Sequence, residues 1–199
     1  SKKYLLGELE RERLFIRPLE WYAEQGVETR FDTRVDDVKP DQKQVITSTG
    51  EAIDYDRLIL CTGSHARSLP AEIGGALAGV FTLRSIADID RMAPEFRSGR
   101  KLLVIGGGYI GLEAAAVARQ LGLEVTLVEM ADRILQRVAA AETSNYFRDL
   151  HSVHGVDIRE SVRMTRLLGE DGAACGAELE SGEVIDADLV LVGIGRSEE

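Results

Sequence analysis

Three glycines near the middle of the chain have the spacing of a phosphate-binding turn. Gly106, Gly108 and Gly111 form the pattern G-x-G-x-x-G. The first glycine allows a tight turn, the second lets a pyrophosphate approach the backbone, and the third lets a helix pack closely on a strand. Backbone N–H groups at the start of that helix would face the phosphates at the positive end of the helix dipole. This spacing therefore predicts the binding of a dinucleotide.

An acid that follows the glycine pattern predicts which dinucleotide is bound. Glu129 lies 23 residues after Gly106, close to the roughly 20 residues expected before a ribose-binding acid. A carboxylate accepts hydrogen bonds from the ribose hydroxyls of NADH and repels the 2′-phosphate of NADPH. We therefore expect a preference for NADH, which the nearby Arg133 could weaken.

The segments around the glycines predict the elements that must position them. Residues 101–105 are a short apolar run, as in a buried parallel strand. Residues 112–121 contain four alanines and no proline, and Gly122 follows, so they predict a helix. Residues 124–129 predict a second strand. This context favours a nucleotide site over a glycine turn that binds nothing, because the glycine spacing alone is a weak signal.

Composition excludes several other classes of function. The formal net charge of −10 argues against a nucleic-acid-binding surface. No apolar run reaches the roughly 18 residues of a membrane span, and no signal peptide is recognisable, so we expect no membrane partner and a cytoplasmic location. The two cysteines and three histidines lack metal-ligand spacing, so no metal site is expected.

The sequence also repeats itself. Residues 49–63 match residues 181–195, and residues 25–30 match residues 154–159 at a similar offset. Each copy predicts a helix, a glycine stop, a short strand, a small antiparallel unit and a buried strand that ends in glycine. A duplicated dinucleotide-binding domain explains the match better than chance similarity between two β-turn-β segments. Because the first copy lacks its opening strand and glycine turn, the sequence resembles an excerpt of a longer protein.

Further elements follow from turn residues and periodicity. Residues 58–61 are an apolar run that predicts a buried strand, with Cys61 as a small buried side chain. The remaining predictions are helices at 18–25, 86–92 and 139–153, a hairpin at 31–49, a loop at 64–79, and strands at 162–168, 173–179 and 189–194.

Residues 105–113, 54–63 and 188–195 together resemble the FAD-dependent pyridine-nucleotide oxidoreductases. Within them the chain is most similar to ferredoxin reductases of the putidaredoxin-reductase and rubredoxin-reductase type. The resemblance implies an α/β fold with two duplicated Rossmann-like dinucleotide-binding domains, the first copy incomplete. Residues 1–84 would be a partial FAD-binding domain, and residues 85–199 the NAD(H)-binding domain.

The same resemblance implies an activity and a partner. The cofactors would be FAD and NAD(H), with hydride passing from NADH to the flavin. Single electrons would then pass to a ferredoxin or rubredoxin-type iron–sulfur protein. Two alternatives remain open: a nucleotide-binding module without turnover, as in apoptosis-inducing-factor-like proteins, and the flavin module of a nitrite reductase or NADH oxidase.

Three residues are expected to be catalytic by resemblance. Lys2 matches a lysine beside the flavin, where related NADH oxidases and peroxidases carry a redox cysteine. Glu113 matches the acid that meets the nicotinamide and pairs with that lysine. Tyr109 matches an aromatic residue that covers the flavin until nicotinamide displaces it.

The other expected contacts are with the cofactors. By resemblance, Val35 would contact the FAD adenine, and Arg84 would lie near the flavin where the chain crosses between domains. Thr62 and Gly63 would follow a strand end over FAD. The full set of expected cofactor-binding residues is Gly106, Gly107, Gly108, Tyr109, Ile110, Gly111, Glu129, Gly193, Ile194, Gly195, Val35, Thr62, Gly63 and Arg84.

Overall fold

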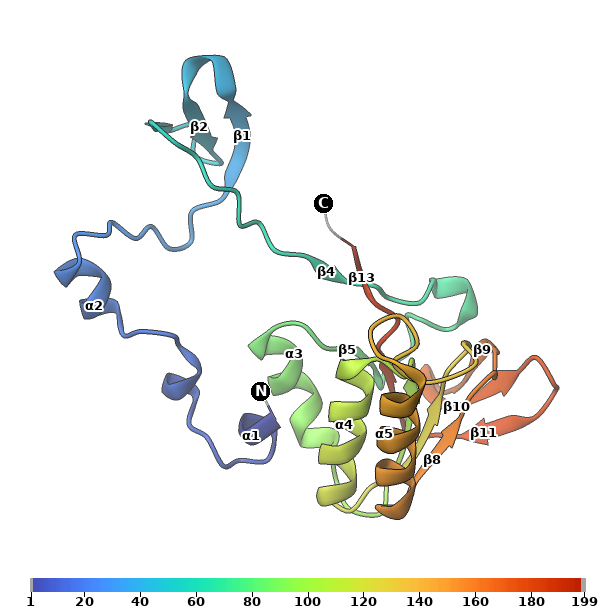
Figure 1. Cartoon of the computed structure of the whole chain (residues 1–199). Helices are drawn as coiled ribbons and strands as arrows, with labels where there is room; N and C mark the ends of the chain where they lie inside the picture. The colour runs from blue at the N-terminus through green and yellow to red at the C-terminus, as the bar shows by residue number, and fades with distance from the viewer. Residues whose placement is uncertain (1, 198–199) are drawn as a thin grey trace. The chain divides into compact units, whose positions relative to one another are not determined.

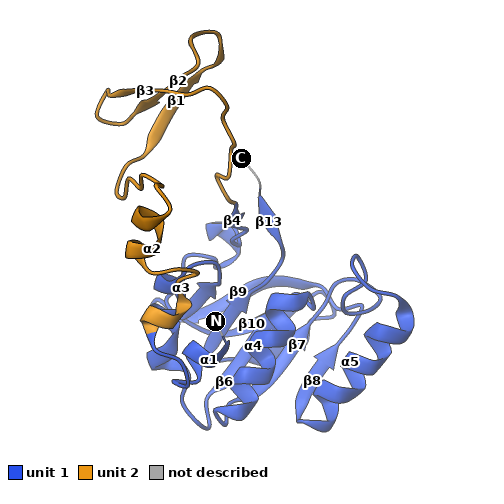
Figure 2. Ribbon diagram, turned by 60° about the vertical axis from the view of Figure 1, so that its left-hand side comes forward, with its two compact units in different colours: residues 1–10, 64–199 blue, residues 11–63 orange. Residues whose placement is uncertain are grey.

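The computed structural model describes residues 2–197 (Figure 1). Ser1, Glu198 and Glu199, at the ends of the two expected domains, lie outside the described residues. The chain divides into two compact units (Figure 2), one formed by Ser1–Glu10 with Ser64–Glu199 and the other by Arg11–Gly63. The boundary expected at residue 84 separates the FAD-binding from the NAD(H)-binding domain. The two compact units are a different division of the chain, so this domain boundary stays a prediction. Among the described residues, no helix is both long enough and apolar enough to cross a membrane.

A five-stranded parallel sheet forms the centre of the larger unit. Its strand order is β5-β12-β6-β7-β8, and every neighbouring pair is parallel. This arrangement confirms the predicted α/β fold class. The strands are β5 (Val80–Thr82), β6 (Lys101–Ile105), β7 (Glu124–Val128), β8 (Val156–Arg159) and β12 (Leu189–Val192).

Helices cover one face of this sheet, as Figure 1 shows for α4 (Tyr109–Gln120) and α5 (Ala141–Val153). Because side chains alternate along a strand, Leu102 and Val104 of β6 pack into the core that contains the α4 side chains. Two shorter helices, α1 (Lys2–Leu5) and α3 (Ile86–Met92), belong to the same unit.

A smaller antiparallel sheet covers the opposite face. It consists of β9 (Met164–Glu170), β10 (Ala173–Leu179) and β11 (Val184–Asp186). Leu103 and Ile105 of β6 belong to the core shared with these strands. The unit is completed by the antiparallel pair β4 (His65–Ala66) and β13 (Arg196–Ser197), and by the 3₁₀ turns η3 (Ala71–Ile73) and η4 (Ala93–Glu95).

The start of α3 carries a complete capping box. Ser85 precedes the helix, and its hydroxyl oxygen accepts a hydrogen bond from the Asp88 N–H at 3.3 Å. In return, Asp88 Oδ2 accepts from the Ser85 N–H at 2.8 Å. Partial burial raises the pKa of Asp88, but the hydrogen bonds from Ser85, Arg91 and Arg84 together outweigh it, so this pKa lies below its ordinary value.

Replacing Asp88 with asparagine is expected to lower the free energy of unfolding at pH 7 by about 0.5–1 kcal/mol. A carboxyl with a lowered pKa stabilises the fold above its unfolded-state pKa and loses that contribution as the pH falls through its folded-state value. The difference between the two proteins should therefore shrink below pH ~4. Urea denaturation at pH 7 and pH 3 measures the free energy of unfolding of the two proteins. An equal difference between them at both pH values would contradict the lowered pKa of Asp88.

The smaller unit contains short helices and one antiparallel sheet. The hairpin predicted at 31–49 is confirmed as β1 and β2. The helix predicted at 18–25 is confirmed as α2, which follows Pro18. The elements are η1 (Arg11–Leu14), α2 (Leu19–Glu24), β1 (Val35–Lys39), η2 (Pro40–Gln42), β2 (Gln44–Thr47) and β3 (Ala52–Asp54).

The buried strand predicted at residues 58–61 is wrong for the described chain. These residues form no strand, and Leu58, Ile59 and Leu60 are 38%, 84% and 66% exposed. Cys61 is exposed as well, although we expected it to be buried. The physical reason is that a parallel strand exists only through hydrogen bonds to its neighbours, and no described strand pairs with this segment.

The helix, the glycine stop and the antiparallel sheet of the repeat are present in both copies, whereas the short strand expected after the glycine forms only in the second copy, as β8. A helix followed by a glycine with positive φ occurs at α2 and Gly26, and again at α5 and Gly155. A three-stranded antiparallel sheet follows in each case, as β1-β2-β3 and as β9-β10-β11. The copies differ at the two strands that need parallel neighbours: β8 pairs with β7 and β12 lies between β5 and β6, whereas residues 27–30 and 58–61 form no strand.

Candidate dinucleotide site

The glycine motif lies between the end of β6 and the first turn of α4. Gly106 has a φ of +108°, which favours glycine, and its N–H donates to the Val128 carbonyl at 2.9 Å. Gly108 is the N-cap of α4, and the helix begins at Tyr109, three residues before the predicted start at 112. The predicted strand–turn–helix is therefore present, and the helix already includes Gly111.

The three glycines of the motif meet different surroundings. A Cβ added at Gly111 would overlap the carbonyl oxygen of Gly106, so this position needs a glycine for close packing. A Cβ at Gly106 would lie 2.5 Å from the Gly193 carbonyl oxygen. At Gly108 a Cβ would meet nothing within 4 Å. This open space is where the motif is expected to admit a pyrophosphate, so the residues present fit a dinucleotide.

Glu129 is held against the glycine turn. It follows β7 directly, and its Oε2 accepts a hydrogen bond from the Gly107 N–H at 2.6 Å. Its Oε1 accepts from the Ala131 N–H at 2.8 Å. A carboxylate has about four lone-pair sites, so Glu129 keeps acceptor capacity for ribose hydroxyls while it orients the turn. The sequence did not predict the contact with Gly107.

The loop after β12 closes the same edge of the sheet. The Gly193 N–H donates to the Ile105 carbonyl at 2.8 Å, which brings the end of β12 beside the glycine turn. Ile194 packs against the core beneath the antiparallel sheet, and the Gly195 carbonyl accepts from the Arg67 N–H at 3.0 Å. Ligands of open α/β sheets bind at the carboxyl ends of the strands, which is where this loop lies.

Lys2 and Glu113 form an ion pair. Lys2 Nζ lies 3.1 Å from Glu113 Oε1, and the two side chains are 53% and 48% exposed. Lys2 belongs to α1, and Glu113 lies in the first half of α4. Tyr109 and Ile110, at the exposed start of α4, are 59% and 46% accessible. The structure thus brings together two residues that are 111 positions apart in sequence, next to the glycine turn.

Comparisons with known proteins agree with this geometry. Residues 2–199 match the family model described as pyridine nucleotide-disulphide oxidoreductase. The chain belongs to that family. It is 42% identical to a ferredoxin–NAD(P)⁺ reductase of Sphingomonas sp., covering 98% of this chain and 47% of the relative. It is also 40% identical to the putidaredoxin reductase of Pseudomonas putida, covering 98% of this chain and 47% of that protein.

A solved structure supports the same placement in the pyridine nucleotide-disulphide oxidoreductase family. A crystal structure of a covalent putidaredoxin reductase–putidaredoxin complex matches with a TM-score of 0.91 and 38% identity, over 98% of this chain and 48% of that chain. The chain spans about half the length of the curated relatives it matches.

Arg133, which could have weakened the preference for NADH, is engaged elsewhere. Its Nη1 donates to the Ala139 carbonyl at 3.0 Å and to Ser144 Oγ at 2.6 Å. Its guanidinium therefore fixes the position of the loop before α5. The role of Glu129 in selecting NADH stays a prediction.

The other expected cofactor contacts fall in two places. Arg84 belongs to the larger unit, where its Nε donates to the Ser64 carbonyl at 3.2 Å. Val35, Thr62 and Gly63 belong to the smaller unit, where Val35 begins β1 and is 47% exposed. The strand end that was expected to carry Thr62 and Gly63 is not formed, for the reason given for residues 58–61. Their roles at FAD stay predictions.

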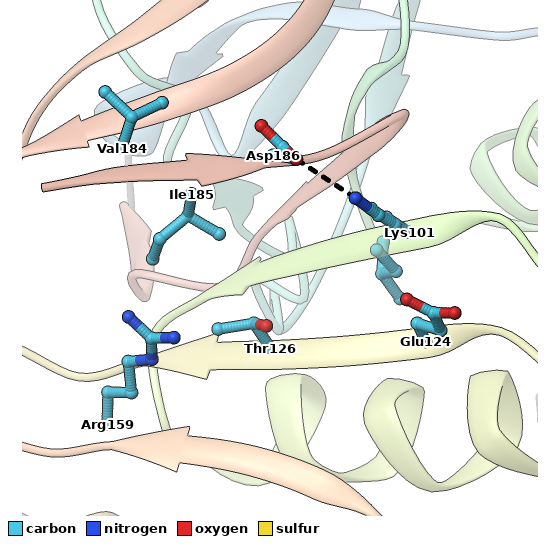
Figure 3. Close-up of a pocket in the computed structure, with 8 residues that line it drawn as sticks. Lys101, Glu124, Thr126, Arg159, Val184, Ile185 and Asp186 are labelled. Atoms are coloured by element: carbon cyan, nitrogen blue, oxygen red, sulfur yellow. Dashed lines mark hydrogen bonds and ion pairs between the residues drawn. The ribbon is translucent and has the colours of Figure 1, made fainter.

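A shallow polar groove lies elsewhere on the larger unit (Figure 3). Its volume is about 230 Å³, and Lys101 Nζ and Asp186 Oδ2 face each other across it at 3.0 Å. The hydrogen bond that Lys101 Nζ donates to the Asp186 carboxylate raises the pKa of Lys101. Lys101 begins β6, whereas the glycine turn follows the other end of that strand, so the groove is separate from the dinucleotide site. No sequence motif marked it.

Proposed function

We propose that the protein is an FAD-dependent NADH:ferredoxin or NADH:rubredoxin reductase that acts in the cytoplasm. The observation that carries this proposal is the Lys2–Glu113 ion pair beside the glycine turn. A lysine at this position, with no cysteine beside it in residues 2–10, favours electron transfer to a separate iron–sulfur protein over a protein thiol relay. Relatives named as reductases of ferredoxin, putidaredoxin and rubredoxin support the same class of partner.

The proposed roles of the residues follow from their positions. The N–H groups at the start of α4 would bind the pyrophosphate, and Glu129 would bind the adenosine ribose. Glu113 and Lys2 would orient the nicotinamide next to the flavin, and Tyr109 would cover the flavin in its absence. When bound, the two cofactors supply the hydride transfer and the release of single electrons, and the protein supplies their orientation.

Replacing Lys2 with alanine tests this proposal. Since both partners are about half exposed, loss of the ion pair should change the free energy of unfolding by less than about 1 kcal/mol. The rate of flavin reduction by NADH should nevertheless fall by about tenfold, because orientation contributes several kcal/mol to such steps. Rapid-mixing absorbance at the flavin band measures the rate, and thermal denaturation measures the stability.

The neighbouring lysine provides a matched control. Lys3 lies in the same short helix, and no catalytic role is assigned to it, so Lys3→Ala should leave the rate within about twofold of the unmodified protein. Equal rates for Lys2→Ala and the unmodified protein would refute the proposed role of the pair. A purified protein that binds NADH but carries no flavin colour would instead favour a nucleotide-binding module without turnover.

A further inference from the structure

The loop between β7 and α5 holds both backbone groups of Gly107. This loop comprises residues 129–140, called the β7–α5 loop below. The Gly107 N–H donates to Glu129 Oε2 at 2.6 Å, and the Gly107 carbonyl accepts from the Leu135 N–H at 2.9 Å. The conformation of the glycine turn therefore depends on where the β7–α5 loop lies.

The Ile134 side chain of this loop packs against the turn at Gly107. It is fully buried, and its Cγ2 would lie 2.5 Å from a Cβ placed at Gly107. Leu135 follows with a positive φ of +55°, a conformation that a leucine adopts only where its surroundings impose it. The loop is thus packed against Gly107 and held in one conformation there.

Glu160 holds the N–H of Ile134. Glu160 follows β8, and its Oε1 accepts from the Ile134 N–H at 2.8 Å. Its Oε2 accepts from Arg148 Nη1 of α5 at 3.0 Å, and the Glu160 side chain is only 16% exposed. One carboxylate therefore connects the loop, the helix that follows it and the strand after that helix.

Ser144 holds the carbonyl of the same residue. This serine of α5 is fully buried, and its hydroxyl donates to the Ile134 carbonyl at 2.7 Å. The same oxygen accepts from Arg133 Nη1 at 2.6 Å. Both backbone groups of Ile134 are therefore fixed by side chains that lie outside the glycine motif.

From this chain of contacts we infer that Glu160 and Ser144 are positioning residues of the dinucleotide site. These two residues fix the position of Ile134. Ile134 and Leu135 in turn fix Gly107, so the glycine turn is held in the form that binds the cofactor. The inference rests on the proposed function, because it assumes that NADH is the ligand of the glycine turn. Neither residue touches the cofactor in this role, so each acts through Gly107.

Substitutions at Glu160 test the inference in the purified protein. Glu160→Ala removes both hydrogen bonds and should raise the Kd for NADH about tenfold, with kcat changed less than about twofold. Glu160→Gln keeps an oxygen that accepts from the Ile134 N–H, so its Kd should return to within about threefold of the unmodified protein. Ser144→Ala should change the Kd in the same direction as Glu160→Ala.

A matched control removes a paired carboxylate far from the loop in sequence. Glu178 of β10 accepts from Arg166 Nε of β9 at 2.6 Å. Glu178→Ala should leave the Kd for NADH within about twofold of the unmodified protein. If Glu160→Ala and Glu178→Ala give the same Kd, Glu160 is not a positioning residue.

Hydrogen exchange provides a second measurement that needs no cofactor. In Glu160→Ala the amides of Gly107, Ile134 and Leu135 should exchange about tenfold faster, while the amides of β6 keep their rates. Equal acceleration in β6 would show a general loss of stability and would overturn the inference. If the unmodified protein binds no NADH, the proposed function fails, and the exchange pattern still decides the role of Glu160. If Ser144→Ala does not fold, the Glu160 variants give the answer alone.

Discussion

Alanine at Gly111 is expected to abolish measurable NADH binding and to lower the free energy of unfolding by about 2–4 kcal/mol. The added methyl group would overlap the carbonyl oxygen of Gly106 and would lie 3.1 Å from Val104 Cγ1. A backbone oxygen in a tight turn cannot rotate away as a flexible side chain can. The higher helix propensity of alanine offsets only about 1 kcal/mol of this cost.

Alanine at Gly108 provides the matched comparison. A Cβ there meets nothing within 4 Å, so the free energy of unfolding should stay within about 0.5 kcal/mol of the unmodified protein. The methyl group would nevertheless occupy the space through which the pyrophosphate approaches the backbone, so the Kd for NADH should rise at least about tenfold. Chemical denaturation and calorimetric titration of both variants measure the two quantities. An unchanged Kd for NADH in both variants would refute the assignment of the glycine turn as the pyrophosphate-binding site.

The second large effect concerns the choice of cofactor. Glu129→Ala should lower the ratio of the Kd for NADPH to the Kd for NADH by about tenfold or more, because a hydrogen bond to a charged group contributes about 1.5–3 kcal/mol. The structure adds a further expectation. Loss of the carboxylate also leaves the N–H groups of Gly107 and Ala131 without their acceptor, so the affinity for both cofactors should fall.

Glu129→Gln separates these two effects. The amide oxygen can still accept one of the backbone N–H groups, while the negative charge that repels a 2′-phosphate is gone. The ratio of affinities should therefore change in Glu129→Gln with a smaller loss of NADH binding than in Glu129→Ala. Fluorescence titration with NADH and with NADPH measures the two affinities. An unchanged ratio in both variants would show that Glu129 does not select the cofactor.

Local patterns in the sequence were sufficient for most of the larger unit. The apolar run at 101–105 and the glycine spacing predicted β6 and the turn into α4, and the structure contains both. The strand β10 and the helix α3 have the predicted bounds. These elements depend on periodicity, caps and turn residues that lie close together in the chain, so a short window of sequence carries the signal.

The sequence did not predict the features that depend on residues far apart in the chain. The sequence of residues 58–61 resembles that of β12, yet one segment is exposed and the other is buried between two strands. Strand formation depends on neighbours, which a local pattern cannot supply. For the same reason the sequence did not reveal that Arg133 is committed to Ser144, or that Glu160 holds Ile134.

The sequence by itself determined the class of ligand, because glycine spacing and an acid at the end of the next strand are local requirements of a dinucleotide turn. It also identified Lys2 and Glu113 as partners, by resemblance. Only the tertiary structure decided which residues hold the glycine turn in position. Glu160 and Ile134 are 26 residues apart, and their contact requires that β7, α5 and β8 pack together.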